Sequence, residues 1–186
     1  PVVVLTGLDD ENSALQAMQQ GAQDYLVKDQ LNSQLLARTV RYAIERKGID
    51  QTLRESEASL NRAQAVAHTG SWKMDVKRNI ITWSAETYRI FGVTSETPLT
   101  YESFLAFIHP DDRDSVNRAW QAALEGAPYD VEHRIFVGEQ VKWVRERAEL
   151  ETDTDGSVLR GIGTSQDITE RKQANEILKE SERRYR

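Results

Sequence analysis

The chain has 186 residues and a formal net charge of −6, from 30 acidic and 24 basic side chains, and it contains no cysteine. This acidic balance disfavours a nucleic-acid partner, because a phosphate backbone would repel it. The absence of cysteine excludes disulfides, thiolate catalysis and cysteine-ligated metals, and it fits a reducing, cytoplasmic location. The longest apolar runs are far shorter than the roughly 20 residues that a membrane helix needs, so we expect no membrane segment.

Two short strands and two helices are predicted at the start of the chain. The β-branched run 2–5 and the run 25–27 are typical of short buried strands. The spacing of apolar residues predicts helices over 11–20 and 31–47. Alternating strands and helices indicate a parallel α/β sheet, although two strands alone cannot make a stable domain of that kind.

The stretches VVVLTG, GAQDYLVKD and LLARTVRYAIERK resemble the second half of a response-regulator receiver domain. In that family a strand-ending hydroxyl residue, a switch aromatic and a strand-ending lysine surround a phosphorylated aspartate, and Thr6, Tyr25 and Lys28 match those positions. A hydroxyl and an ammonium group suit an aspartyl phosphate. The resemblance implies that residues 1–47 are the C-terminal remnant of a receiver domain, whose acceptor aspartate would lie before Pro1. Taken singly, the three residues only end strands or pack.

A helical, coiled-coil-like connector is predicted over 48–67, where only Gly48 interrupts the helical pattern. Its apolar and small residues recur at 3.5-residue spacing, which is typical of weakly paired helices. The phrase LRESEASLN returns one small domain later as LKESERRYR, which indicates connectors in series and makes 173–186 a connector to a following module. The two copies place these seam residues in one phase: Ile49, Leu53, Ser56, Leu60, Leu178, Ser181 and Tyr185. We expect a homodimer through these helices; a solvated, charged helix end is the alternative interpretation.

An α+β module is predicted between the two connectors. Strands over 71–76 and 80–83 flank a polar turn, and Ser84 is a suitable N-cap for the helix that follows. A helical apolar cluster comes next, and a longer helix begins at Pro110 and stops before Gly126. Three strands with alternating apolar residues complete a five-stranded antiparallel sheet around these helices.

The stretches AHTGSW, TWS, YRIFG, IHPDD and GTSQDITERK resemble a PAS domain with its C-terminal PAC segment. The resemblance implies a sensor domain over 68–172, with an antiparallel five-stranded sheet and flanking helices. In that family an Asp-Ile-Thr element ties the last strand to the outgoing helix. Asp167, Ile168 and Thr169 match this element, so we expect them to transmit a signal, and the triplet also fits an ordinary helix N-cap.

A PAS domain can hold haem, flavin, an organic acid or nothing, so the cofactor here is none or an unknown small ligand. The missing cysteine excludes an adduct-forming flavin photosensor. His68, His109 and His133 lack the spacing of a metal site, and we expect no bound metal. Aromatic residues at these spacings are more often core than cofactor-binding. The candidates for lining a pocket are Trp83, Tyr88, Phe91, Phe104, Ile108, Trp120, Phe136 and Trp143.

No phosphate-binding loop, nucleophile triad or catalytic carboxylate pair is recognisable in the sequence, so we expect no enzyme activity within it. The resemblances imply a signal-sensing and relay segment of a two-component or phosphorelay protein. It would pass the state of the PAS or receiver part through paired helices to other signalling modules of the same parent chain. The alternatives are the regulatory part of a cyclic-dinucleotide synthase, such as a diguanylate cyclase, and a PAS spacer that serves only structure or dimerisation.

Overall fold

The structure is a computed structural model that describes residues 1–7, 11–28, 32–95 and 99–184. The chain divides into two compact units, Pro1–Leu60 and Asn61–Arg186. Within the described residues, no helix is both long and apolar enough to cross a membrane. Each unit has its own sheet: the sheet of the first unit is parallel, and the sheet of the second is antiparallel.

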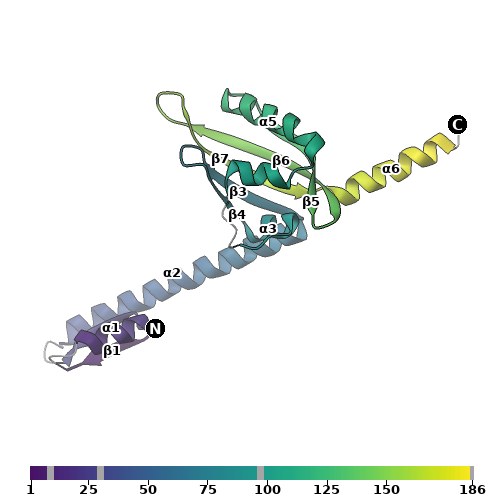
Figure 1. Cartoon of the computed structure of the whole chain (residues 1–186). Helices are drawn as coiled ribbons and strands as arrows, with labels where there is room; N and C mark the ends of the chain where they lie inside the picture. Colours follow the sequence, from purple (N-terminus) through teal and green to yellow (C-terminus); the bar gives the residue numbers. More distant parts are fainter. Residues whose placement is uncertain (8–10, 29–31, 96–98, 185–186) are drawn as a thin grey trace. The chain divides into compact units, whose positions relative to one another are not determined.

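The first unit contains a strand-helix-strand motif: β1 (Val3–Thr6), α1 (Glu11–Gln19) and β2 (Asp24–Val27). The two strands pair in parallel, from Val3 opposite Asp24 to Thr6 opposite Val27. Gly21 follows α1 with a φ of +103°, a conformation that glycine adopts without strain. The predicted parallel arrangement is therefore present, as a two-stranded sheet (Figure 1).

The long helix α2 (Ser33–Val66) follows β2. It includes both the predicted helix over 31–47 and most of the predicted connector over 48–67, so the expected boundary between the two falls inside one helix. Gly48 does not interrupt it, since a single glycine costs a helix only about 1 kcal/mol. The start predicted at residue 31 lies outside the described residues.

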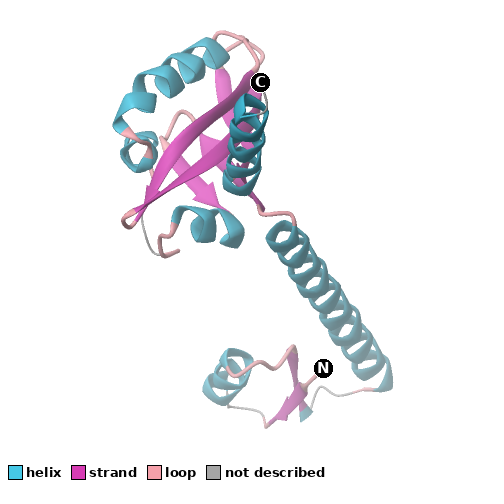
Figure 2. Cartoon of the chain, turned by 90° about the vertical axis from the view of Figure 1, so that its right-hand side faces the viewer, coloured by secondary structure: helices cyan, strands magenta, loops and turns pink. Residues whose placement is uncertain are grey.

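The second unit is built on a five-stranded antiparallel sheet. Its strands are β3 (Thr69–Asp75), β4 (Ile80–Trp83), β5 (Tyr129–Val137), β6 (Gln140–Thr152) and β7 (Val158–Asp167), in the spatial order β4-β3-β7-β6-β5. Its helices are α3 (Ala85–Phe91), α4 (Tyr101–Phe107), α5 (Pro110–Leu124) and α6 (Thr169–Arg184). Figures 1 and 2 show the twisted sheet with short helices packed on one face. The predicted five-stranded sheet with flanking helices is confirmed.

The short helices begin and end where local chemistry favours it. The Ser84 hydroxyl accepts a hydrogen bond from the Thr87 amide at the start of α3, as its N-cap position predicts. Thr100 and Ser103 form a reciprocal capping box at the start of α4. Pro110 occupies the first turn of α5, where its missing N–H is not needed. These caps determine where the three helices begin along the chain.

The ring of Trp72 on β3 packs closely against Gly163 on β7. Trp72 lies opposite Gly163 in the antiparallel register. A Cβ at residue 163 would overlap the Trp72 ring and the carbonyl oxygen of Arg147. Because no side chain stands between them, the Trp72 ring lies flat against β7 and meets Trp120 edge to face at 6.2 Å.

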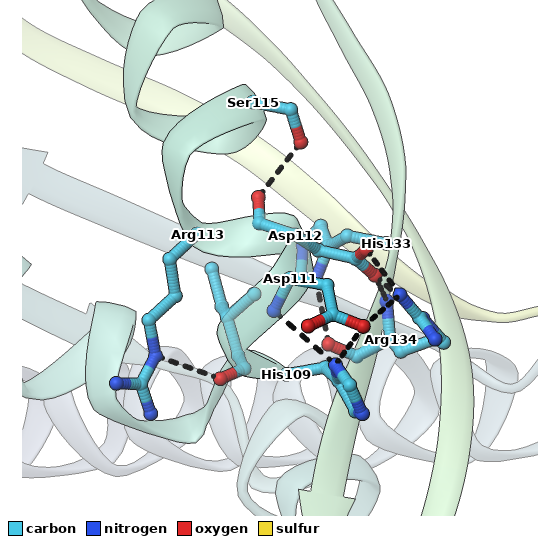
Figure 3. A network of polar contacts seen from close by, with 8 residues as sticks. His109, Asp111, Asp112, Arg113, Ser115, His133 and Arg134 are labelled. Atoms are coloured by element: carbon cyan, nitrogen blue, oxygen red, sulfur yellow. Dashed lines mark hydrogen bonds and ion pairs between the residues drawn. The ribbon is translucent and has the colours of Figure 1, made fainter.

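Helix α5 is held to strand β5 by a bidentate ion pair. Asp112 Oδ2 accepts hydrogen bonds from the backbone N–H and Nε of Arg134 at 2.8 and 2.9 Å, and Oδ1 accepts from the guanidinium at 2.6 Å (Figure 3). The His109 amide donates to the carbonyl of the same Arg134 at 2.9 Å. These bonds lower the pKa of Asp112 to about 2.

Replacing Asp112 with asparagine should destabilise the protein by about 1 to 2 kcal/mol at pH 7, since solvent screens part of the ion pair. The pKa of Asp112 is depressed in the folded state, so this contribution is present above about pH 4 and disappears as the pH falls towards 2. Urea unfolding of wild type and Asp112→Asn across this range measures it. Asp114→Asn, on the exposed side of α5, is the control and should change little. An equal loss in both variants would contradict the assignment.

Candidate functional site: the core cavity and the strand-to-helix junction

The sheet unit encloses a small cavity between the sheet and helices α4 and α5. Its volume is about 20 Å³, which is the space of a single water molecule. Its lining is largely aromatic and consists of Trp72, Met74, Ile81, Trp83, Tyr101, Phe104, Trp120, Tyr129 and Glu146. Three of the side chains predicted from the sequence, Trp83, Phe104 and Trp120, therefore line it.

The other five predicted pocket residues lie elsewhere. Phe91 and Ile108 are buried in the core, and Tyr88 packs partly buried beside Trp83. Phe136 is 39% exposed and stacks on His109 at 5.0 Å. Trp143 lies beneath the Lys172 ammonium group, 4.4 Å from its ring centroid. Phe136 and Trp143 belong to the outward-facing sets of β5 and β6, so placing them in the pocket was wrong.

Six lining residues were not predicted, namely Trp72, Met74, Ile81, Tyr101, Tyr129 and Glu146. The signal for Glu146 is present in the sequence: it alternates with Val144 and Ala148 on β6, so it shares the inward face with two apolar residues. The charge of a glutamate argues against burial, and this conflict is why periodicity alone did not identify it.

Among the described residues that line the cavity, Glu146 is the one with a carboxyl group. It is 2% exposed, and its Oε1 accepts a hydrogen bond from the Ser165 hydroxyl at 2.7 Å. Burial raises its pKa to about 7, and the polar groups nearby, chiefly the Ser165 hydroxyl, oppose this rise only in part. By strict geometry the Trp72 N–H has no acceptor, so it lies near the carboxyl group without bonding it directly.

The cavity does not fit the large planar cofactors. Its volume is far below the several hundred Å³ of a typical ligand pocket. The sequence offers no cysteine for a flavin adduct. Over the described ranges no three histidine or carboxylate side chains cluster as metal ligands, and Asp112 is engaged by Arg134. The buried His133 has its pKa lowered to about 4 by desolvation, so it is neutral at pH 7.

The second feature of the unit is the junction where β7 becomes α6. The Asp167 amide donates to the carbonyl oxygen of His68 at 2.9 Å, so the segment after α2 is bonded to the end of β7, two residues before α6 begins. The Ile168 amide donates to the Trp143 carbonyl at 2.9 Å, and the Trp143 amide donates to the Thr169 hydroxyl at 3.0 Å. Asp167 also caps the Thr169 amide. The predicted triplet thus ties three chain segments together.

Charged side chains reinforce this junction. Lys142 Nζ lies 3.3 Å from Asp167 Oδ2, and Lys172 lies 2.7 Å from Glu132. Arg171 pairs with the same Glu132 carboxylate. The first turn of α6 is therefore attached to β5 and β6 as well as to β7. A polar cleft of about 620 Å³ borders it, lined in part by His68, Arg89, Lys142, Asp167 and Thr169.

The predicted receiver residues lie in the first unit. Thr6 ends β1 and is 8% exposed, Lys28 follows β2, and Thr6 and Lys28 are at the same end of the parallel pair. Tyr25 is 40% exposed.

The predicted seam residues lie on the two long helices. On α2, Ile49, Leu53 and Leu60 are all more than half exposed, and Ser56 is exposed as well. On α6, Leu178 and Ser181 are exposed. Tyr185 lies outside the described residues.

Replacing Thr169 with valine removes the acceptor of the Trp143 amide while keeping a side chain of the same shape. The lost bond should cost about 1 kcal/mol or more locally. We expect the Trp143 and Ile168 amides to exchange with solvent about tenfold faster, measured by hydrogen exchange. Thr164→Val on the exposed face of β7 is the matched control and should leave both amides unchanged. Unchanged exchange in Thr169→Val would show that the hydroxyl does not hold the junction.

Comparison with known proteins identifies this arrangement. Residues 80–165 match the PAS fold family. The chain is 34% identical over 157 residues to the blue-light-activated histidine kinase of Brucella ovis, a match that covers 83% of this chain and 31% of that protein. The chain thus spans about a third of the length of this relative.

Solved structures agree with the match. A sensory box histidine kinase/response regulator from Burkholderia thailandensis superposes with a TM-score of 0.57 and 27% identity, covering 68% of this chain and 96% of that one. The N-terminal domain of a diguanylate cyclase from Marinobacter aquaeolei gives a TM-score of 0.51 at 19% identity, over 54% of this chain and 95% of that one, and shows the fold alone. The sheet unit is therefore a PAS domain, homologous to parts of a blue-light-activated histidine kinase and of a sensory box histidine kinase.

Proposed function

We propose that this chain is a signal-sensing and relay segment of a multi-domain, two-component signalling protein. The observation that carries this proposal is the junction at Asp167, Ile168 and Thr169. There His68 is hydrogen-bonded to the end of β7 at Asp167, and Trp143 of the neighbouring strand β6 is hydrogen-bonded to Ile168 and to Thr169 at the start of α6. A change in the pairing of β6 and β7 therefore acts directly on the origin of the outgoing helix.

The hydrogen bonds of the junction favour a switch over a passive link. Ile168 is 3% exposed and anchors the turn, while Thr169 and Asp167 satisfy amides that would otherwise be unpaired. A small shift of β7 must break or move these bonds together, since each shares a residue with the next. Such groups of bonds have few alternative arrangements, which suits a two-state response.

The relay part of the proposal needs a partner helix. On α2 the side chains of Ile49, Leu53 and Leu60 lie at 3.5-residue spacing and are exposed in the single chain. A shallow groove beside Ile49 and Leu53 runs along the same face of this helix. Apolar side chains in such a seam are stabilised when a second copy covers them, so we infer a homodimer paired through α2 and, with Leu178 and Ser181, through α6.

Leu53→Asp combined with Leu60→Asp should convert the dimer to a monomer, because four carboxylates would meet in the seam. Sedimentation velocity of the full chain measures the change. The control is Gln51→Asp combined with Asn61→Asp, which adds the same charge away from the seam and should preserve the dimer. Circular dichroism should show equal helix content in both variants. A dimer that persists in the seam variant would place the interface elsewhere.

The first unit fits a receiver origin. Its parallel strand-helix-strand order, and the common end at which Thr6 and Lys28 lie, support the proposal that residues 1–47 come from the C-terminal half of a receiver domain. A phosphorelay is then the natural context. A histidine kinase is favoured as the parent over a cyclic-dinucleotide synthase, because the sequence relative at 34% identity is a kinase whereas the likeness to a diguanylate cyclase concerns the fold only. The chain itself would carry regulation and no catalysis.

A second candidate function is a spacer whose core is filled by side chains and senses nothing. The small volume of the cavity, about 20 Å³, favours it. The two candidates differ in their response to solution conditions. A sensor should show a shift in melting temperature with some small molecule or with pH that acts through the core, whereas a spacer should show none beyond the general effect of the medium. Differential scanning fluorimetry against a panel of small metabolites and buffers makes this distinction.

A further inference from the structure

Glu146 is a buried acid without a counter-ion. It faces Val131 on β5 and Ser165 on β7 in the sheet register, and neither is charged. Throughout the described part of the chain, no ion pair includes it. An unpaired carboxylate is costly in an apolar interior, so such a group either takes up a proton or finds another polar partner.

The cavity beside Glu146 offers one such partner. Its volume of about 20 Å³ accommodates one water molecule and excludes an organic ring. The Trp72 indole N–H, on a residue that is 7% exposed, lines the same cavity and has no acceptor. A water molecule that accepts from this N–H and donates to the free oxygen of Glu146 satisfies both groups at once.

We propose that the ligand of this PAS core is a proton, which Glu146 takes up from and releases to bulk solvent, while one water molecule bridges its carboxyl group and the Trp72 indole N–H. Protonated Glu146 is neutral and donates one hydrogen bond, whereas ionised Glu146 only accepts. The exchange therefore changes which bonds hold β6, β7 and β3 together around Trp72 and Ser165. For its output this inference rests on the proposed relay function; proton binding itself does not.

The surroundings leave Glu146 as the group that titrates near neutral pH. From α4 and β5 the titratable neighbours are Tyr101, Tyr129 and His133. Burial raises the pKa of both tyrosines and lowers that of His133 to about 4, so all three are uncharged at pH 7. The residues that line the cavity from α5, β3 and β4 carry no titratable group; they are Trp120, Trp72, Met74, Ile81 and Trp83. From β7, Ser165 contributes only its hydroxyl.

The position of Glu146 connects it to the junction. Glu146 lies opposite Ser165 in the ladder of β6 and β7, and Val144 lies opposite Asp167 two residues further along. Asp167 begins the hydrogen bonds that hold α6. A change in bonding at Glu146 therefore has to pass along only two residues of the β6–β7 ladder to reach Asp167, the residue that caps the outgoing helix.

The test is the pH dependence of stability in the full chain with and without Glu146→Gln. The folded pKa of Glu146, about 7, exceeds the ordinary value of 4.5, so the folded state binds the extra proton between these values. Wild type should therefore lose stability relative to the glutamine variant as the pH rises from 4.5 to 7, by about 5 °C or more in melting temperature. His133 acts in the opposite direction, but it is present in both proteins and cancels in the difference. Glu149→Gln, on the exposed face of β6, is the control and should follow wild type.

A direct measurement avoids any effect of the substitution on folding. Carboxyl ¹³C NMR of wild type, assigned with the glutamine variant, should show Glu146 titrating near pH 7. Trp72→Phe keeps a ring and removes the N–H, so it should raise that value further, because the bridging water that donates to the carboxylate loses the N–H that orients it. Titration near 4.5, or no titration below about pH 9, would overturn the proposal. An unchanged value in Trp72→Phe would overturn the bridging role of Trp72.

Failure of the relay gives a different result. Protection factors of the Trp143 and Ile168 amides, which correct hydrogen exchange for the pH dependence of its intrinsic rate, report on the junction when compared at pH 6 and pH 8. If Glu146 titrates near pH 7 and these amides respond in wild type but not in Glu146→Gln, both the proton site and its output are supported. If Glu146 titrates and the amides do not respond, proton binding stands and the proposed relay from the core fails.

Discussion

The antiparallel pairing of β6 with β7 is the interaction on which the rest of the PAS domain depends. One ladder places the Glu146 carboxyl group opposite Ser165, sets Ala148 opposite the Gly163 on which Trp72 lies, and brings Val144 opposite Asp167 at the start of α6. The core acid and the helix junction are therefore neighbours on the same pair of strands. Because the strands share backbone hydrogen bonds, neither can shift in register without moving both features.

The close approach at Gly163 explains why the interior is filled. With no Cβ at residue 163, the Trp72 indole packs directly against β7, and Trp120 of α5 meets it edge to face. The remaining cavity is as small as one water molecule because two large indoles have already taken the volume. The same packing brings the Trp72 N–H to the cavity wall beside Glu146. The position of Trp72 therefore explains both why the cavity is small and why part of its wall is polar.

The carboxyl groups of the domain fall into two groups: those in ion pairs and the buried, unpaired Glu146. Asp112 with Arg134, Asp167 with Lys142, and Glu132 with Lys172 form partly exposed ion pairs. Hydrogen bonds lower the pKa values of these carboxylates, from Arg134 to Asp112, from Thr169 to Asp167 and from Lys172 to Glu132. Glu146 has a hydroxyl and no cation, and desolvation raises its pKa to about 7. The ion pairs position helices and remain ionised at neutral pH. The core acid is the group whose charge can change there.

Local chemistry determined the elements. Alternating apolar residues defined the strands, Ser84 and Pro110 marked helix starts, and the Asp167-Ile168-Thr169 triplet identified the junction, because caps and pleats act over a few residues. Which side chains line the cavity depended on the tertiary structure. Trp72, Tyr101, Tyr129 and Glu146 meet there from separate elements, and Phe136 and Trp143 point away from it. The sequence by itself determined the strands and the helices. Only the packed sheet decided which side chains enclose the cavity, since strands distant in sequence must pair before their inward faces share one interior.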